Sequence, residues 1–279
     1  MTSPVATTYR VVLGIFLRSL RERAGLTPTE VARRFGWYGV AKVSKVEAGT
    51  VRLSEDELAT LLAMYEVTGP EADKLNEFGG MARVRTGAGR TPAWGDTYKV
   101  LEAHASEIKL YYETVLPGTV QTEDYAQALL SMSLTTPPAD VARAARERAT
   151  RQELLTSDNP PDCWLVVAEP ALLRPVGGKQ VFRAQLERLR ELIELPHVTF
   201  QLLPLDKEEH HALGTPFTLV RLAVPALSIV YLEGLTDADY LDHPKDTDVY
   251  TLAFDRLRVT ALDDRASAKR LDRRISELK

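Results

Sequence analysis

The sequence predicts a multi-domain protein in which an all-α bundle of short helices is followed by a mixed α/β (α+β) domain. A chain of 279 residues is long enough for two or three domains. Its first 78 residues show only the apolar spacing of helices, whereas later segments alternate between helical and strand-like patterns. We therefore predict a helical domain over 1–78, a flexible glycine- and arginine-rich linker over 79–93, and an α+β domain over 94–279.

The first two helices are delimited by glycines and by a capping signal. An amphipathic helix stops at Gly25. The next begins at Pro28, where Thr27 and Glu30 can form a capping box, and Gly36 ends it. The residues expected on the buried faces are Leu13, Leu17, Leu20 and Ala24 in the first helix, and Val31, Ala32 and Phe35 in the second.

Three further helices complete the predicted bundle. The third is expected over 40–48 and is stopped by Gly49. A second capping box, formed by Ser54 and Glu57, opens the fourth, and a fifth is expected over 70–78. The residues expected to point inward are Val40, Val43 and Val46 in the third helix, and Leu58, Leu61, Leu62 and Tyr65 in the fourth.

The last region mixes strands with helices. We expect a strand within 107–118, a buried strand over 163–169, and three more strands in close succession after residue 197. The helices expected here are a short one over TEDYAQALLSM, a long one over PADVARAARERATRQELLT, one over 179–195, and two final helices over roughly 244–262 and 264–278.

Charge is distributed unevenly along the chain. Residues 1–52 contain nine basic and three acidic side chains, which gives a net charge of +6. The whole chain has a net charge of −4, so the remainder carries −10. A small basic domain on an acidic chain is typical of a protein that meets a polyanion through one domain only.

The cysteine count and the N-terminus bear on the compartment. Cys163 is the only cysteine, so the chain can form neither an internal disulfide nor a cysteine-based zinc cluster. The N-terminal apolar run is short, lacks a charged start, and is broken by Arg10 and Arg18. We therefore expect no signal peptide, no membrane span and no membrane partner, and a cytoplasmic, nucleoid-associated location.

Two helices joined by a short turn inside a bundle follow the helix-turn-helix plan, in which the second helix enters the major groove of DNA. The order LRSLRERAGLTPTEVARRFGW…KVSKVEAG…LSEDELATLLAMYEV resembles the Xre or phage-repressor class of helix-turn-helix proteins over about residues 10–67. The resemblance implies that Lys45 faces base edges and that Lys42 faces the groove or a phosphate. This chain departs from the class at Val40 and Ala41, which offer only methyl contacts, and at Gly39, which lengthens the turn.

The predicted DNA-contacting residues lie in and around the third helix. Lys42 and Lys45 are its cations, and Ala41 offers a methyl group. Glu47 is predicted to pair with an arginine of the first or second helix. The alternative left open is that these are solvated groups of a bundle that binds protein. Supporting DNA contacts are predicted from Arg33, Arg34 and Arg52 and from the hydroxyl groups of Thr27, Thr29 and Tyr38.

The region after Trp94 also shows a family resemblance. Four segments occur in order: YYETVLPGTVQTEDYAQALL, WLVVAEPALLRPVGGKQVFRAQLERLRELIELPHVTFQLLPL, GTPFTLVRL and IVYLEGLTDADYL. They resemble the domain of unknown function that follows an Xre-type helix-turn-helix in WhiJ-like (Scr1-type) actinobacterial regulators, over about residues 94–262. The resemblance implies a transcriptional regulator that works with a small partner protein in an antitoxin-like pairing, and it implies no ligand or reaction.

Four polar residues of the last region are candidates for ligand binding. Glu169 is the last residue of the predicted buried strand. Arg174 precedes a Pro-Val-Gly-Gly turn that could cradle an anion, although a plain turn is the simpler interpretation. Tyr231 and Glu233 lie at a strand tip that could line a pocket, although Glu233 could equally be an exposed turn residue.

Catalytic signatures are not found in the sequence. It contains no HExxH, Walker or GxSxG motif. The adjacent His210 and His211 would diverge on a helix or a strand, so we expect no metal site there. We predict no catalytic residue, no enzymatic activity, no metal and no cofactor.

These observations predict a sequence-specific DNA-binding transcriptional regulator whose C-terminal domain senses a small ligand or a small partner protein. Double-stranded DNA is the expected partner. A homodimer is expected because one short helix buries too little surface for tight specific binding. Two alternatives stay open: an antitoxin-like protein-interaction module that does not bind DNA, and an enzymatic C-terminal domain tethered to a DNA-binding head.

Overall fold

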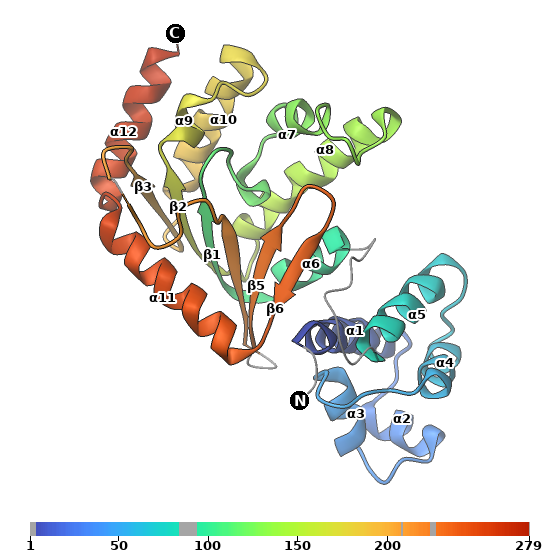
Figure 1. The fold of residues 1–279 in the computed structure, drawn as a ribbon. Helices are drawn as coiled ribbons and strands as arrows, with labels where there is room; N and C mark the ends of the chain where they lie inside the picture. The colour runs from blue at the N-terminus through green and yellow to red at the C-terminus, as the bar shows by residue number, and fades with distance from the viewer. Residues whose placement is uncertain (1–3, 84–93, 208, 224–226, 279) are drawn as a thin grey trace. The chain divides into compact units, whose positions relative to one another are not determined.

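The computed structural model describes residues 4–83, 94–207, 209–223 and 227–278 (Figure 1). The chain forms two compact units. Unit 1 comprises Met1–His104 and Leu222–Thr247, and unit 2 comprises Ala105–Arg221 and Asp248–Lys279. The helical N-terminal region and the mixed α/β region that follows confirm the predicted fold class.

The helices of unit 1 begin and end largely where the capping signals predicted. Both capping boxes are formed, with Thr27 opening α2 and Ser54 opening α4. Gly36 ends α2 in the left-handed conformation with φ 75°, which glycine adopts without strain. The helices are α1 (Pro4–Arg23), α2 (Pro28–Phe35), α3 (Ala41–Glu47), α4 (Glu55–Met64), α5 (Pro70–Arg83) and α6 (Trp94–Ala103).

Three details of this region differ from the prediction. Ala24, expected on the buried face of the first helix, is exposed, because α1 ends before it at Arg23. Val40 does not point inward: it precedes α3 and keeps 42 % of its surface exposed, because the helix starts one residue later. Helix α5 continues through Gly79 and Gly80 to Arg83, so the first residues of the predicted linker are helical. The rest of that predicted linker, 84–93, lies outside the described residues.

Helix α1 is the element around which unit 1 is packed. Buried side chains follow one another along it, and it lies against α3, α5, α6 and β6. Near its start, the backbone N–H and the hydroxyl of Thr8 both donate to Oδ2 of Asp242, at 2.8 and 2.7 Å. The next residue, Tyr9, packs its ring near those of Phe78 and Tyr240. Unit 1 is therefore joined by polar and aromatic contacts across distant parts of the sequence.

The strands form one six-stranded sheet in the order β3-β2-β1-β4-β5-β6. Strands β1, β2 and β3 are parallel, with Leu110 beside Leu165 and Leu165 beside Phe200. Strands β5 and β6 are antiparallel. The strands are β1 (Ala105–Tyr112), β2 (Asp162–Ala168), β3 (Val198–Leu203), β4 (Phe217–Leu222), β5 (Leu227–Glu233) and β6 (Ala238–Leu241).

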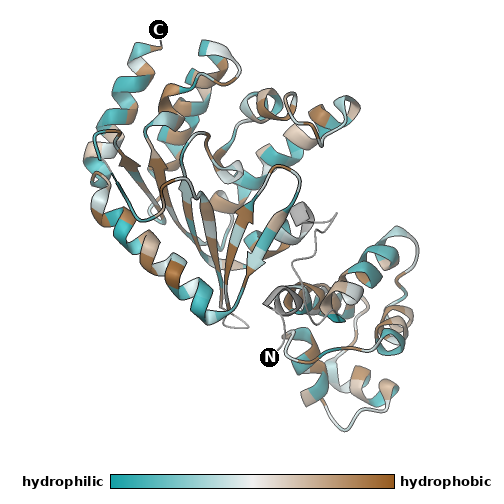
Figure 2. Cartoon of the chain, in the orientation of Figure 1, coloured by the Kyte–Doolittle hydropathy of each residue, from teal (hydrophilic) through white to brown (hydrophobic). Residues whose placement is uncertain are grey.

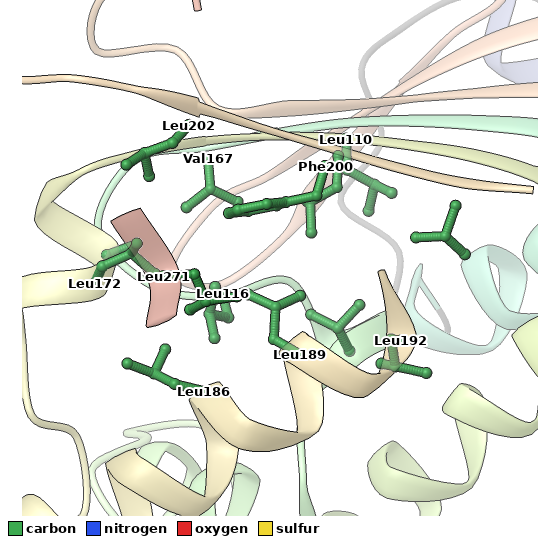
Figure 3. Packing of buried hydrophobic residues seen from close by; sticks show 14 of the residues in the cluster. Leu110, Leu116, Val167, Leu172, Leu186, Leu189, Leu192, Phe200, Leu202 and Leu271 are labelled. Atoms are coloured by element: carbon green, nitrogen blue, oxygen red, sulfur yellow. The ribbon is translucent and has the colours of Figure 1, made fainter. Parts of the chain in front are cut away.

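Successive side chains of the parallel strands point to opposite faces of the sheet, and both faces are buried in unit 2. On one face, Val167, Phe200 and Leu202 meet the leucines of α10 and Leu271 of α12; Figure 3 shows these side chains pointing toward one another. On the other face, Trp164 lies edge-on to Phe254 of α11 and under the guanidinium of Arg258. The strands are mainly hydrophobic and α12 mainly hydrophilic, as Figure 2 shows.

The helices and short helical turns of unit 2 surround this sheet. The predicted long helix after the 137–138 proline pair is divided, because α8 ends at Ala149 and a 3-10 helix continues the chain. Sequence patterns also missed α6 and the four-residue strand β6. The elements are α7 (Glu123–Leu130), α8 (Val141–Ala149), α9 (Pro170–Leu173), α10 (Gly178–Leu192), α11 (Pro244–Thr260), α12 (Asp264–Glu277), and the 3-10 helices Gly118–Val120, Pro138–Asp140 and Thr150–Thr156.

In the part of the chain that the structure covers, no helix combines the length and hydrophobicity that a membrane crossing requires.

Candidate nucleic-acid interface

Helices α2 and α3 and the turn between them form the candidate interface. The capping box fixes the start of α2: the hydroxyl of Thr27 accepts from the backbone N–H of Glu30 and donates to its carboxylate. In the turn, Gly39 has φ 87°, a backbone conformation that favours glycine. The turn leaves the side chain of Tyr38 fully exposed beside the start of α3.

Two glycines let α1 approach α3 at backbone contact. A Cβ atom on Gly14 would lie 2.4 Å from the carbonyl oxygen of Glu47. A Cβ on Gly49 would lie 2.6 Å from Cα of Val11, and Gly49 also has φ 68°. Both positions therefore require glycine, and together they fix how deeply α3 sits against α1.

A buried ion pair locks the far end of α3. The guanidinium of Arg21 donates to both carboxylate oxygens of Glu47, at 2.5 and 3.2 Å, and to the carbonyl of Leu26 at 2.9 Å. The two side chains are only 8 % and 12 % exposed. Hydrogen bonding to Glu47 raises the pKa of Arg21. The predicted pairing of Glu47 with an arginine of the first or second helix is thus confirmed.

Lys42 is engaged within the bundle. Its ammonium donates to Oε1 of Glu57 at 2.6 Å and lies 4.5 Å from the centre of the Trp37 ring. Although burial pushes the pKa of Glu57 upward, hydrogen bonds from Lys42 and from the backbone N–H of Ser54 hold it below its usual value. Lys42 therefore ties the start of α3 to the start of α4, and only part of its side chain is exposed.

The exposed face of α3 consists of Ala41, Ser44 and Lys45. Residues three and four apart lie on the same side of a helix, so these side chains form one surface. Val43 and Val46 face the core, at 2 % and 5 % exposure. The sequence prediction omitted Ser44, although its spacing from Ala41 and Lys45 already placed it on the outward face.

The supporting residues divide into exposed and engaged groups. Arg33, Arg34 and Thr29 are exposed. Arg52 is partly buried. The pKa of Arg10 is lowered mainly by its own burial and further by the nearby positive charge of Arg52. Because Thr27 already serves the capping box, its hydroxyl has little capacity left for a phosphate.

The two ligand candidates of unit 2 have different surroundings. Glu169 forms an ion pair with Arg270, with 3.0 Å between Oε1 and Nε, and accepts a hydrogen bond from the backbone N–H of Leu205 at 3.0 Å. It lines a cavity of about 100 Å³ together with charged side chains of α12. Arg174 is exposed and does not line this cavity.

The other two ligand candidates lie in unit 1. Tyr231 is 3 % exposed, and its ring centre lies 4.3 Å from that of Tyr98 and 5.4 Å from that of Tyr240. Its ring is thus part of an aromatic core. Glu233 is exposed at the end of β5. Two of the four candidates thus belong to unit 2 and two to unit 1.

A polar cluster that the sequence did not predict lies at the end of β1. The hydroxyl of Tyr111 donates to Glu113 at 2.7 Å, and Nε2 of His210 lies 3.3 Å from that hydroxyl. Glu113 also accepts from the backbone N–H of Gly214 at 2.8 Å. Burial raises the pKa of Tyr111 well above its usual value. These contacts hold the segment after β3 against the sheet.

Comparison with known protein families gives two matches. Residues 12–75 match a family described as a helix-turn-helix domain, and this range contains the α2–turn–α3 unit. Residues 96–273 match the family described as Domain of unknown function (DUF5753). Neither the curated proteins nor the solved structures contain a match. Because the second match covers more than half of the 279 residues, the chain belongs to the DUF5753 family and carries a helix-turn-helix domain before it.

Proposed function

We propose that this protein is a sequence-specific DNA-binding transcriptional regulator with the two-domain layout of the WhiJ-like (Scr1-type) regulators. The observation that carries the proposal is the geometry of α3. Its buried side is fixed by Gly14, Gly49 and the Arg21–Glu47 pair, while Ala41, Ser44 and Lys45 face outward from it. A helix held rigidly with one small polar face free is what reading a major groove requires.

Affinity in this account comes largely from phosphates. The outward face of α3 offers one cation, one hydroxyl and one methyl group, which support fewer base contacts than the amides and arginines common in such helices. The arginines of the basic first 52 residues, with their net charge of +6, supply sequence-independent attraction. Arg33 and Arg34 are exposed for this role.

We infer that the protein acts as a homodimer in the cytoplasm, associated with the nucleoid. A reading helix of seven residues contacts only a few base pairs, and two copies would read two half-sites. In this proposal the C-terminal region is the sensing part, which takes a small ligand or a small antitoxin-like partner protein. We assign it no catalytic role.

A protein-binding bundle is the second candidate function. The specific observation in its favour is that Tyr38 and Val40, two apolar side chains next to α3, are exposed at 107 % and 42 %. Aromatic and aliphatic groups of this kind are typical of protein interfaces.

Fluorescence anisotropy with the DNA upstream of the protein's own reading frame separates the two functions. The regulator predicts specific binding whose logarithm falls linearly with the logarithm of salt concentration. The double change Ser44→Ala and Lys45→Ala should weaken specific binding by about 10- to 100-fold. Lys179→Ala, an exposed lysine on α10, is the matched control and should leave affinity unchanged. Absence of binding to both the upstream and a scrambled duplex would instead favour the protein-binding bundle.

A further inference from the structure

A second cavity of unit 2 has a chemistry unlike that of the Glu169 cavity. It has a volume of about 560 Å³ and lies where α7 ends and α8 begins. We call it the α7–α8 pocket. Small-molecule sites in proteins typically have volumes of about 300–1,000 Å³. The α7–α8 pocket is therefore large enough for a drug-sized compound, whereas the Glu169 cavity, at about 100 Å³, is not.

None of the ten residues that line the α7–α8 pocket has an ionisable side chain. The charged side chains of Asp140, Arg143 and Glu147 do not line it and pair with one another, Arg143 with Asp140 at 3.0 Å and with Glu147 at 2.7 Å. An ionised ligand would lose hydration in this pocket without gaining a countercharge, which is costly. The lining is made by aliphatic, proline, hydroxyl and carboxamide groups, among them Gln127, Ser131, Leu134, Thr136, Val141 and Ala142.

Hydrogen bonds hold the wall of the pocket in place. The hydroxyl oxygen of Ser133 accepts from the backbone N–H groups of Thr135 and Thr136, at 3.2 and 3.1 Å. The hydroxyl of Ser131 donates to the carbonyl of Gln127 at 2.7 Å. Behind the wall, a small apolar cluster joins α7 to α8. A wall fixed in this way loses little conformational entropy when a ligand binds.

From these features we propose that the α7–α8 pocket binds a neutral small molecule that combines an apolar body with one or two hydrogen-bonding groups. The Gln127 carboxamide and the Thr136 hydroxyl can donate to and accept from such groups. None of the residues predicted from the sequence to bind ligand lines this pocket. This site would give the proposed sensing role of the C-terminal region a specific location. Only the regulatory effect of ligand binding rests on the proposed function; the binding itself does not.

Two fluorescent probes that differ by one charge test the proposal on the full-length chain. N-phenyl-1-naphthylamine is neutral, and 8-anilinonaphthalene-1-sulfonate has the same ring system with a sulfonate added. The neutral probe should bind saturably to one site, at least about tenfold more tightly than the anionic probe. Hydrogen exchange should show protection of the backbone N–H groups between 131 and 142 when it binds.

Two arginine substitutions on α8 locate the binding. Ala142→Arg places a long cation in the pocket from an exposed position and should weaken the neutral probe by about tenfold or more. Thr150→Arg adds the same side chain near the other end of α8, outside the lining, and should leave affinity within about twofold. If Ala142→Arg fails to fold by circular dichroism, Ser131→Arg, at another lining residue, replaces it.

Three results would overturn the assignment: no saturable binding of the neutral probe, equal or tighter binding of the anionic probe, or unchanged binding in a folded Ala142→Arg variant. None of these measurements involves DNA. Failure of the proposed DNA-binding function would instead appear in the anisotropy experiment and would leave the probe titration unaffected.

Discussion

The contacts that position α3 in unit 1 differ in kind from those in the sheet core of unit 2. Helix α3 has seven residues, and its position depends on two buried valines, one ion pair and two glycine contacts at backbone distance. The sheet core of unit 2 joins twenty buried apolar residues from strands, helices and loops. The comparison teaches that the first arrangement depends on a few irreplaceable atoms, whereas the second spreads its stability over many similar contacts.

Among the substitutions predicted here, one at Gly49 should reduce stability the most. Gly49→Ala forces a Cβ against the backbone of Val11 at a position with φ 68°. The strain and overpacking together should lower the free energy of unfolding of unit 1 by about 4 kcal/mol. Gly80→Ala, in the helix α5 with open space around it, is the control and should instead stabilise by about 0.5–1 kcal/mol. Denaturant unfolding measures both free energies of unfolding. A small loss of stability for Gly49→Ala would contradict the claim that Gly49 fixes α3 rigidly against α1.

The buried ion pair should come next. Glu47→Ala leaves Arg21 without its carboxylate in a position where only 8 % of the side chain is exposed. We expect a loss of about 3–4 kcal/mol, because an uncompensated buried charge is costly. Glu71→Ala breaks an ion pair with Arg23 in which both side chains are about half exposed, and should change stability little. Similar losses for the two variants would contradict the special role of Arg21 and Glu47.

A cavity created in the core of unit 2 should lower the free energy of unfolding by about as much as truncations in other protein cores do. Leu189→Ala removes a fully buried side chain of α10 and should destabilise unit 2 by about 3 kcal/mol. Leu189→Met keeps the volume and should cost less than about 1.5 kcal/mol. Thermal unfolding followed by near-ultraviolet circular dichroism compares them. If Leu189→Met destabilises unit 2 as much as Gly49→Ala destabilises unit 1, the proposed difference between the two units is wrong.

A pH effect is expected at the contact between α1 and β6. Burial raises the pKa of Asp242 to about 6, above its usual value, although Thr8 donates two hydrogen bonds to it. The folded state therefore binds this proton more tightly than the unfolded chain does. Its contribution to stability is fully present below about pH 4 and is lost as the pH rises through about 6.

Asp242→Asn keeps an acceptor for Thr8 and removes the titration. At pH 8 this variant should be more stable than the natural chain by up to about 2 kcal/mol, with a smaller difference at pH 4. Denaturation midpoints across this pH range measure the effect. A natural chain that gains stability between pH 4 and 6 relative to Asp242→Asn would show that the carboxylate is favoured in the fold.

What the sequence predicted well was local. The capping boxes of Thr27 with Glu30 and of Ser54 with Glu57 each lie within four residues, and the structure has both. The buried leucines of α4 and the strands β1 to β5 were also found from short patterns. These features depend on one turn of helix or on alternation along one strand, which a sequence displays directly.

What it missed depends on contacts between distant residues. The engagement of Lys42 by Glu57 involves fifteen residues of separation, so nothing in the helix pattern itself showed that this lysine has an internal partner. Gly14 was not recognised because its requirement comes from Glu47 on another helix. The α7–α8 pocket arises where one helix ends and another begins, and its uncharged lining has no motif of its own.

Selection of DNA from a randomised duplex pool by the full-length protein tests the central claim most directly. The account predicts enrichment of a sequence motif with two related half-sites, about 10–11 base pairs apart or a multiple of this spacing. The Ser44→Ala, Lys45→Ala variant should lose that motif while it remains folded. Failure of the natural protein to enrich any sequence, or enrichment of the same motif by this variant, would contradict the assignment of α3 as the reading helix.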